Sequence, residues 1–276
     1  MTLDIQAVTN CLEETARTLV LPRFSRLSAD EVVAKATPGD PDDVVTIVDR
    51  EVETHLSRVL AALIPSTAII GEEAAHHRPA LLQRLASDQP LWLIDPIDGT
   101  KNFAAGDGGF GIMVAYVVEG QAQAAWVVLP ARCQTFVAEA GSGTFVNGER
   151  IRVPSAPQER RSRGAVLVRY MPDGLGHTVT DALHGHVLMN PPSGCAAIEY
   201  TDILRGVNDF VVYYRLLPWD HAAPALILTE AGGRVGHVGG QPYTARSDSQ
   251  LTIVARDIGV SDQLCAWLRP HVPRGS

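Results

Sequence analysis

One segment in the first half of the chain constrains the fold more than any other, because it is an apolar strand that ends in two carboxylates. It reads Trp92-Leu93-Ile94-Asp95-Pro96-Ile97-Asp98-Gly99-Thr100. Pro96 fixes its own φ and has no N–H group to donate, so Asp95–Asp98 is predicted to form a rigid turn. The strand must be buried in a sheet, and the turn must emerge at the edge of that sheet. There both carboxylates can converge on one point, in a position of the kind that usually carries functional groups.

Two other segments also place acidic residues where an apolar element ends. They are Gly71-Glu72-Glu73, which follows the short strand Ala68-Ile69-Ile70, and Trp219-Asp220-His221-Ala222-Ala223, which opens a predicted helix. Each feature has a simpler explanation when it is taken alone. Asp95 and Asp98 could be turn formers, Asp220 could cap its helix, Glu72-Glu73 could be a solvated pair, and His221 is interpreted as a surface residue of the first helical turn. The three segments together favour a functional site.

The paired carboxylates predict a divalent cation. No Lys or Arg lies between Asp95 and Asp98 to neutralise them, so two close carboxylates would raise each other's pKa. A set of oxygen ligands with no adjacent Cys or His pair suits Mg²⁺ better than Zn²⁺. Gly99-Thr100 then offers backbone N–H groups to a phosphate, provided that a helix begins there.

Length and charge narrow the classes of function. The chain has 276 residues and a net charge of −8, with 46% hydrophobic and 20% charged residues. This composition is that of a globular protein, not a disordered one. An acidic surface repels nucleic acid, and the densest basic cluster, Arg160, Arg161 and Arg163, is interpreted as a solvated loop. We therefore expect no nucleic-acid partner, whereas a small phosphorylated molecule can bind if cations reverse the local field.

The chain carries no predicted membrane span or secretory signal. Its longest apolar run is Ile112–Val118, well short of the ~18 residues that a span needs. We therefore expect a cytoplasmic protein. The scattered cysteines form no Cys-x-x-Cys pair and are expected to be free thiols of a reducing compartment; they are Cys11, Cys133, Cys195 and Cys265. Residues 272–276 resemble the remnant of a protease cleavage site and are left out of the functional argument.

The order of predicted elements indicates a layered α/β or α+β fold. Apolar spacing predicts helices over about 3–21 and 46–63, and Glu119-Gly120-Gln121 separates two strands of a hairpin. The second half alternates strands with helices, predicted over 196–204, 220–231 and 257–268. We expect two packed subdomains, 1–150 with most of the metal ligands and 151–271 with Asp220 and the substrate pocket.

At this point the sequence closely resembles the inositol monophosphatase family of Mg²⁺-dependent, Li⁺-sensitive phosphatases. The motifs that carry the resemblance occur in the family's order: Val45-Thr46-Ile47-Val48-Asp49, Gly71-Glu72-Glu73, Asp95-Pro96-Ile97-Asp98-Gly99-Thr100-Lys101-Asn102-Phe103, Trp219-Asp220-His221-Ala222-Ala223 and Glu230-Ala231-Gly232-Gly233. They span essentially the whole chain. The resemblance implies a layered αβαβα sandwich of the inositol monophosphatase and fructose-1,6-bisphosphatase type, usually in a homodimer.

The resemblance also implies roles for individual residues. Glu72, Asp95 and the carbonyl of Ile97 would hold one Mg²⁺. Asp95, Asp98 and Asp220 would hold a second, and a third, weaker ion could sit near Glu72. Thr100, hydrogen-bonded to Asp49, would orient the attacking water and help to deprotonate it, with Glu73 behind the metal ligands. The amides of Gly99 and Thr100 would bind phosphate oxygens, and Lys35 could approach the metals when its loop closes.

Some positions depart from the family pattern in ways that touch the substrate. Tyr213 stands where the family has the acid that binds inositol, and Arg215 nearby is hypothesised to meet a second anionic group. The segment that lines the substrate pocket is matched by Gly194-Cys195-Ala196, with Cys195 where Thr is frequent. None of these changes affects the predicted metal ligands.

The motifs and the resemblance together predict a Mg²⁺-dependent phosphomonoesterase that acts on a small phosphorylated polyol or sugar-like molecule, such as inositol 1-phosphate. We expect direct in-line hydrolysis without a phosphoenzyme, because no nucleophilic side chain is required. Alternative substrates within the family are histidinol phosphate, a 3′,5′-bisphosphonucleotide, fructose 1,6-bisphosphate and the 2′-phosphate of NADP. Alternatives of another class are a regulatory binding protein that keeps the fold and a metal-binding module without turnover.

Overall fold

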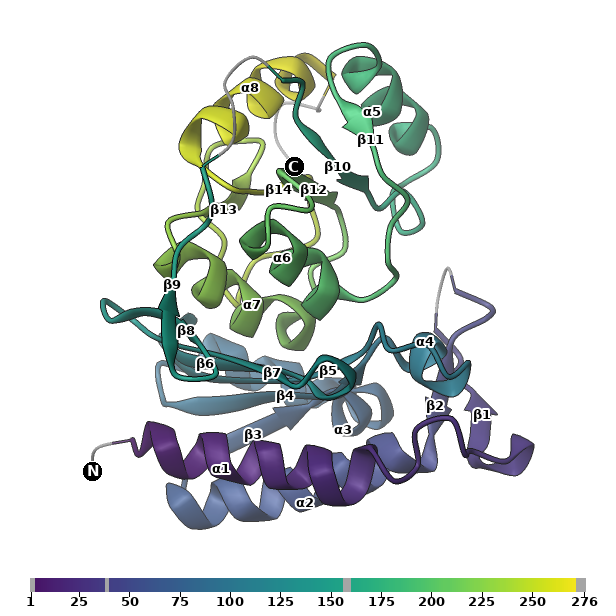
Figure 1. Cartoon of the computed structure of the whole chain (residues 1–276), viewed down its shortest axis with the longest axis vertical. Coiled ribbons are helices and arrows are strands. Elements are labelled where there is room, and N and C mark those ends of the chain that lie inside the picture. The colour runs from purple at the N-terminus through teal and green to yellow at the C-terminus, as the bar shows by residue number, and fades with distance from the viewer. Residues whose placement is uncertain (1–2, 38–39, 156–159, 272–276) are drawn as a thin grey trace.

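Five layers make up the fold, in the order helices, sheet, helices, sheet, helices (Figure 1). The computed structural model describes residues 3–37, 40–155 and 160–271. The helix layers are α1 (Ile5–Thr15) with α2 (Ile47–Leu63), α6 (Ala196–Leu204) with α7 (Pro218–Glu230), and α5 (Leu175–Leu183) with α8 (Ile258–Leu268). The expected αβαβα sandwich is confirmed.

The first sheet has seven strands in the order β3-β4-β5-β6-β7-β8-β9. Only the β3–β4 pair is parallel, and every other neighbour is antiparallel. The bounds are β3 (Ala68–Gly71), β4 (Leu91–Asp98), β5 (Gly111–Val118), β6 (Gln121–Leu129), β7 (Gln134–Glu139), β8 (Gly143–Val146) and β9 (Glu149–Ile151). The predicted hairpin turn is confirmed between β5 and β6, where Glu119 and Gly120 both have positive φ.

The second sheet has five strands in the order β11-β10-β12-β14-β13. Here β10 lies parallel to both β11 and β12, while β14 lies antiparallel to β12 and β13. The bounds are β10 (Arg163–Val166), β11 (Leu188–Met189), β12 (Phe210–Tyr213), β13 (Arg234–His237) and β14 (Thr252–Ala255).

Short elements complete the chain. A two-stranded antiparallel ribbon joins β1 (Val32–Ala34) to β2 (Val44–Thr46), and two short helices are α3 (Glu72–His77) and α4 (Thr100–Ala104). Single helical turns lie at Ala29–Glu31, Pro130–Arg132 and Arg269–His271, a longer 3₁₀ segment lies at Pro79–Ala86, and a wider turn over Ala16–Val20 continues α1. No helix in the described residues is long and apolar enough to cross a bilayer.

Burial explains why the central strands are apolar almost throughout. Successive side chains of β4 point to opposite faces of the sheet. Trp92 and Ile94 pack toward α1 and α2, while Leu91 and Leu93 belong to the core on the side of α6 and α7. Both faces are covered, so the strand needs apolar residues at every position until it reaches the carboxylates. A third core lies between the five-stranded sheet and the helices α5 and α8.

The prediction of a separate turn at Asp95–Asp98 is wrong. Strand β4 continues through Asp98, and its pairing with β5 contains an irregularity: Asp95 lies opposite Met113 and Asp98 opposite Gly111. Three steps on β4 therefore match two on β5, which is a bulge. Pro96 offers no N–H group to the ladder, and a bulge is one of the few places in a sheet that tolerates proline. The irregular strand end still exposes the carboxylates.

Three smaller interpretations are also wrong. Helix α7 begins at Pro218, with Leu217 as its cap, so Asp220 is the third helical residue and not the cap. His221 is buried, not a surface residue. Arg160 is not merely solvated, because its guanidinium makes two hydrogen bonds, of 2.6 and 2.7 Å, to the buried carboxylate of Asp209.

Candidate active site

Four acidic side chains from three separate elements form one electrostatic cluster. Asp95 and Asp98 come from the irregular end of β4, Glu72 opens α3 and Asp220 lies in the first turn of α7. The pKa of Asp95 is well above its ordinary value, because burial disfavours its charge and because Glu72, Asp98 and Asp220 repel it. The structure therefore brings together all four side chains that the resemblance assigned to metal.

Asp95 lacks a hydrogen-bond donor at one of its oxygens. Its Oδ1 is buried without a partner among the described residues, and an unpaired buried oxygen is costly. Asp98 is better supported. Its Oδ2 accepts a 2.6 Å hydrogen bond from the backbone N–H of Ala197, near the start of α6. Burial nevertheless raises the pKa of Asp98. Both side chains thus retain acceptor capacity that a cation could use.

Lys35 joins two of the acidic side chains. Its Nζ lies 2.7 Å from Glu72 Oε1 and 2.6 Å from Glu73 Oε1, and its side chain is 5% exposed. The pKa of Lys35 is raised: burial opposes the charge, but the two carboxylates outweigh it. The resemblance implies that Lys35 can approach the metals when its loop closes. The structure places it against Glu72 itself.

Thr100 and Asp49 form a hydrogen-bonded pair beside the cluster. Thr100 Oγ1 lies 3.0 Å from Asp49 Oδ1 and 2.9 Å from the carbonyl oxygen of Ile97, and it can donate its single proton to either. The other Asp49 oxygen accepts a 2.9 Å bond from the N–H of Thr46, which caps α2. Burial raises the pKa of Asp49 to about 7. The carboxylate is thus fixed, and it is a stronger base than an exposed aspartate.

Gly99 shapes the turn that presents Thr100. Its φ is +80°, in the left-handed region, and a Cβ there would lie 2.8 Å from the carbonyl oxygen of Gly109 and 3.0 Å from Cys195 Cβ. Only glycine satisfies both conditions without strain. Helix α4 begins directly afterwards at Thr100.

Sequence reasoning missed Glu53. This buried side chain accepts hydrogen bonds from the N–H groups of Glu73 and Ala74, at 2.8 and 2.9 Å, and so holds the start of α3. Burial raises the pKa of Glu53 to about 7. A signal was present: Glu53 follows Asp49 by four residues, so both acids lie on the apolar face of α2 with Val52 and Leu56.

The expected pocket-lining segment lies beside Asp98. Cys195 caps α6, and its Sγ donates a 3.0 Å hydrogen bond to Asp98 Oδ2. Gly194 precedes it with a positive φ, and Ala196 is the first residue of the helix. Burial raises the pKa of the Cys195 thiol well above its ordinary value, with Asp98 adding to the shift. The thiol is therefore a hydrogen-bond donor and not a nucleophile.

Tyr213 is more buried than its predicted role suggests. Its side chain stacks on Tyr200, with ring centroids 5.8 Å apart, and meets the edge of His221 at 4.7 Å. Its hydroxyl is buried and has no partner among the described residues. Burial raises the pKa of Tyr213, with the charge of Glu199 adding to the shift. Tyr213 therefore stays neutral and offers one hydroxyl where the family has a charged acid.

Neighbouring His221 has a structural role that its sequence context hid. Its Nε2 lies 3.1 Å from the carbonyl oxygen of Arg215, which can only accept, so Nε2 carries the proton. Its Nδ1 then accepts from the Tyr200 hydroxyl, also at 3.1 Å. Burial lowers the pKa of His221 to about 3. The neutral ring fixes the backbone of Arg215, whose guanidinium lies 3.5 Å from the centre of the Tyr170 ring.

The residues present fit a bound cation. Burial raises the pKa of Glu72, Asp95, Asp98 and Asp220, so a cation bound among them would stabilise their ionised forms. The unpaired Asp95 oxygen points to the same conclusion. Within the described residues, no three Asp, Glu, His or Cys side chains already stand at the spacing of a metal-ligand set. The ligands would have to draw together around the ion.

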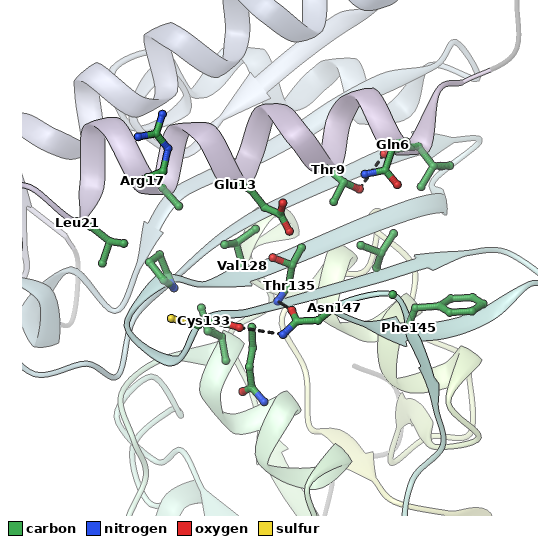
Figure 2. Close-up of a pocket in the computed structure, with 17 residues that line it drawn as sticks. Gln6, Thr9, Glu13, Arg17, Leu21, Val128, Cys133, Thr135, Phe145 and Asn147 are labelled. Carbon is green, nitrogen blue, oxygen red and sulfur yellow. Dashed lines mark hydrogen bonds between the residues drawn. The ribbon is translucent and has the colours of Figure 1, made fainter.

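A separate hollow lies away from these carboxylates. It has a volume of about 740 Å³ and lies between α1 and the strands β6 to β8. Figure 2 shows Gln6, Thr9 and Glu13 of α1, with Arg17 of the turn that continues it, on one side and Thr135 with Asn147 on the other. Asn147 there accepts from the N–H of Thr135 at 2.8 Å and donates to the carbonyl of Cys133 at 2.9 Å. None of the predicted site residues lines it.

The motifs, the fold and the carboxylate cluster agree with one known family. The profile described as "Inositol monophosphatase family" matches residues 4–270. The chain belongs to the inositol monophosphatase family. The membership that the motifs predicted is thereby confirmed, and the protein is a phosphoric monoester hydrolase of that family.

Curated relatives in the inositol monophosphatase family carry several names. A fructose-1,6-bisphosphatase/inositol-1-monophosphatase of Thermotoga maritima is 35% identical over 205 residues, covering 74% of this chain and 75% of its own. A Nus factor SuhB of Pseudomonas aeruginosa is 30% identical and covers 94% of this chain and 93% of its own. A histidinol-phosphatase of Chlorobaculum parvum is 32% identical, with 84% and 85% covered.

Solved structures agree on the fold. A Thermotoga maritima inositol monophosphatase superposes with a TM-score of 0.77 at 29% identity, covering 95% of each chain. The extragenic suppressor protein SuhB from Bartonella henselae gives a TM-score of 0.78 at 24% identity, covering 97% of this chain and 98% of its own. The second likeness concerns the fold alone.

Proposed function

We propose that this chain is a Mg²⁺-dependent phosphomonoesterase that hydrolyses a small phosphorylated polyol or sugar-like metabolite. The observation that carries the proposal is the Thr100–Asp49 pair beside the carboxylate of Asp95, which Glu72, Asp98 and Asp220 repel. A cation site alone needs no hydroxyl–carboxylate pair, whereas hydrolysis needs a group that orients a water and accepts its proton.

Mg²⁺ is proposed to bind through Glu72, Asp95, the carbonyl of Ile97, Asp98 and Asp220, as two or three ions. The donors are all oxygen atoms, which is the ligand set that Mg²⁺ prefers. Bound Mg²⁺ would supply positive charge for the phosphate oxygens and lower the pKa of the attacking water. Glu73 is proposed to support the metal ligands without binding the metal itself, since it holds Lys35 against Glu72.

The proton is proposed to move along a short relay in the chain itself. The attacking water donates to Thr100 Oγ1, and the proton of Thr100 passes to Asp49 Oδ1 over the 3.0 Å bond. Asp49 suits this role because burial raises its pKa to about 7, near that of an effective general base at neutral pH. The attack is in line, and no covalent intermediate forms.

The remaining residues are proposed to hold the substrate. The amides of Gly99 and Thr100 bind phosphate oxygens at the turn that precedes α4. Gly194, Cys195 and Ala196 form the wall beside Asp98. Tyr213 offers no charged acceptor at the position proposed to contact the substrate, and its hydroxyl is buried, which argues against a pocket tuned to inositol itself.

The first test is phosphate release from a panel of inositol, histidinol, nucleotide and sugar phosphates, with Mg²⁺, with EDTA and with added Li⁺. One preferred substrate that is hydrolysed only with Mg²⁺, and more slowly with Li⁺, is expected. No release from any substrate by folded, Mg²⁺-loaded protein would refute the proposal and favour a regulatory role, which the name of the Pseudomonas relative makes the second candidate. We also propose a cytoplasmic homodimer, for which gel filtration should give about twice 29.6 kDa.

A further inference from the structure

A second charged cluster lies next to the candidate active site, and one buried carboxylate is at its centre. Asp40 is 3% exposed. Its Oδ1 lies 2.8 Å from Lys101 Nζ, and its Oδ2 lies 2.7 Å from both an Arg169 guanidinium nitrogen and the Tyr170 hydroxyl. Three donors from two distant parts of the chain thus surround a single anion.

The fold places these donors beside the reacting groups. Lys101 directly follows Thr100 in α4. Arg169 and Tyr170 follow β10, and Arg215 follows β12; the two strands are parallel neighbours, with Val166 opposite Val212. Parallel strands end at the same edge of a sheet, so Tyr170 and Arg215 meet there, with the guanidinium over the ring. The charge of Arg215 in turn reaches Asp220 and lowers its pKa, against the larger effect of burial.

Three cations lie at or near Asp40. Lys101 and Arg169 bind it directly, and the positive charge of Arg215 lies just beyond Tyr170. Arg169 has a further carboxylate, Asp42, only at 3.8 Å, and the Asp42 side chain is 77% exposed. Asp43 adds a further negative charge that reaches Tyr170. The side chains of Lys101 and Arg169 are 36% and 48% exposed, so an incoming anion can reach them.

We propose that Lys101, Arg169 and Tyr170 bind a second anionic group of the substrate, and that the Asp40 carboxylate occupies the place of that group when no substrate is bound. The inference rests on the proposed function and specifies its substrate class: a phosphate monoester that carries a further phosphate or carboxylate. Tyr170 donates its hydroxyl hydrogen, while Lys101 and Arg169 supply charge-assisted hydrogen bonds. Arg215, packed on the Tyr170 ring, holds that ring in position.

Two matched pairs of substrates test the subsite with Mg²⁺ present. Fructose 1,6-bisphosphate and fructose 1-phosphate share one ester and differ by a second phosphate. 2-Phosphoglycerate and glycerol 2-phosphate share another and differ by a carboxylate. We expect a ratio of two-anion to one-anion kcat/KM above one in at least one pair. A high ratio in the fructose pair would indicate a second phosphate, and a high ratio in the glycerol pair would indicate a carboxylate. Arg169→Gln and Tyr170→Phe should lower that ratio, Arg169→Gln by about tenfold, as expected for one charge-assisted hydrogen bond.

Asp40→Asn is the complementary variant, because it removes the competing charge without removing a donor. We expect it to raise the ratio of two-anion to one-anion kcat/KM. A ratio that falls as it does in Arg169→Gln would show that Asp40 only supports the loop. The control is Arg205→Gln, which removes an arginine of similar exposure (45%) that pairs with Asp202 at 3.4 Å; both activities should stay unchanged.

A binding measurement separates this inference from the proposed function. The rise in Tm caused by each compound is measured with Ca²⁺ in place of Mg²⁺, in the wild type and in Arg169→Gln. A larger rise with the two-anion compound, lost in Arg169→Gln, supports the subsite even if no substrate is hydrolysed. The subsite is overturned if each compound raises the Tm equally in wild type and Arg169→Gln, or if the ratio of two-anion to one-anion kcat/KM is the same in both proteins. If the substrates are still hydrolysed, the proposed function stands in either case.

Discussion

The carboxyl group of Glu53 occupies the space that a side chain at position 71 would need. A Cβ built on Gly71 would overlap the Glu53 carboxyl group. This close approach lets Glu53 accept hydrogen bonds from the N–H groups of Glu73 and Ala74, at the start of the helix that carries Glu72. The glycine of the Gly-Glu-Glu motif thus makes room for an acid on α2.

Replacing Gly71 with alanine should therefore weaken both stability and activity. We expect Gly71→Ala to lower the free energy of unfolding by about 2–4 kcal/mol, the sum of overpacking and lost hydrogen bonds. Phosphate release should fall as well, because the start of α3 moves with Glu72. Urea unfolding measures the first effect. Gly239→Ala is the control, because no atom lies within 4 Å of its Cβ, and a loss as large there would contradict the explanation.

Asp95→Asn should separate function from stability. As the loss of a predicted metal ligand, the change should lower turnover by more than ~100-fold at saturating Mg²⁺. In EDTA the same variant should unfold at a higher temperature than the wild type, because Asp95 has an unpaired oxygen among repelling carboxylates. Asp181→Asn, an exposed change on α5, should alter neither quantity. Full turnover in Asp95→Asn would exclude Asp95 as a ligand.

Thr100 is expected to orient the attacking water and not to bind the metal. Thr100→Ala should lower kcat strongly and leave the Mg²⁺ affinity nearly unchanged, because it removes the hydroxyl that contacts Asp49 and the Ile97 carbonyl but none of the proposed ligands. Thr100→Ser keeps a hydroxyl and should recover most of the activity. Steady-state kinetics over a range of Mg²⁺ concentrations separates the two quantities. A matching loss of Mg²⁺ affinity in Thr100→Ala would contradict this division.

Lys35 is expected to stabilise the protein most when Mg²⁺ is absent. Lys35→Met leaves the buried Glu73 and the partly buried Glu72 without their cation, and breaking a buried pair such as Lys35–Glu73 costs about 3–5 kcal/mol. In EDTA the variant should therefore unfold well below the wild type, and Mg²⁺ should raise its Tm by more than it raises that of the wild type. Arg17→Met, which breaks a surface pair with Glu14, should show neither effect. An equal response to Mg²⁺ would contradict the prediction.

His237 predicts a loss of stability in mild acid. Burial lowers its pKa from the ordinary 6.5, and its ring nitrogens lie 2.8 Å from Thr252 Oγ1 and 3.0 Å from Ser247 Oγ. As the pH falls below about 6.5, the unfolded chain binds a proton that the folded state resists. Stability should thus fall, and fall less in His237→Gln. The measurement is urea unfolding between pH 7.5 and 5; His184→Gln, an exposed histidine, should keep the wild-type slope.

Local patterns were sufficient to predict much of the fold. The apolar spacing of 46–63 and 196–204 corresponds closely to α2 and α6, because one helical face depends only on residues three and four apart. The β5–β6 hairpin follows from its turn residues. The carboxylates of the candidate site were also visible, because each ends an apolar element and such elements have to be buried.

Other features were decided by contacts between distant residues. That β4 continues through Asp98 depends on pairing with β5, and the burial of His221 depends on Tyr200 and Arg215. Glu53 accepts hydrogen bonds from the backbone N–H groups of Glu73 and Ala74, which lie 20 and 21 positions further along the chain.

The amino-acid sequence by itself thus determined the layered organisation and the acidic residues at the ends of apolar elements, because these follow from burial and short-range geometry, and the resemblance of its motifs identified the family. The tertiary structure alone decided that Lys35 pairs with Glu72 and Glu73, and that Asp40 gathers Lys101, Arg169 and Tyr170. A charged side chain pairs with the opposite charge that lies close to it in space. That proximity is set only once the two sheets and the helices between them have packed.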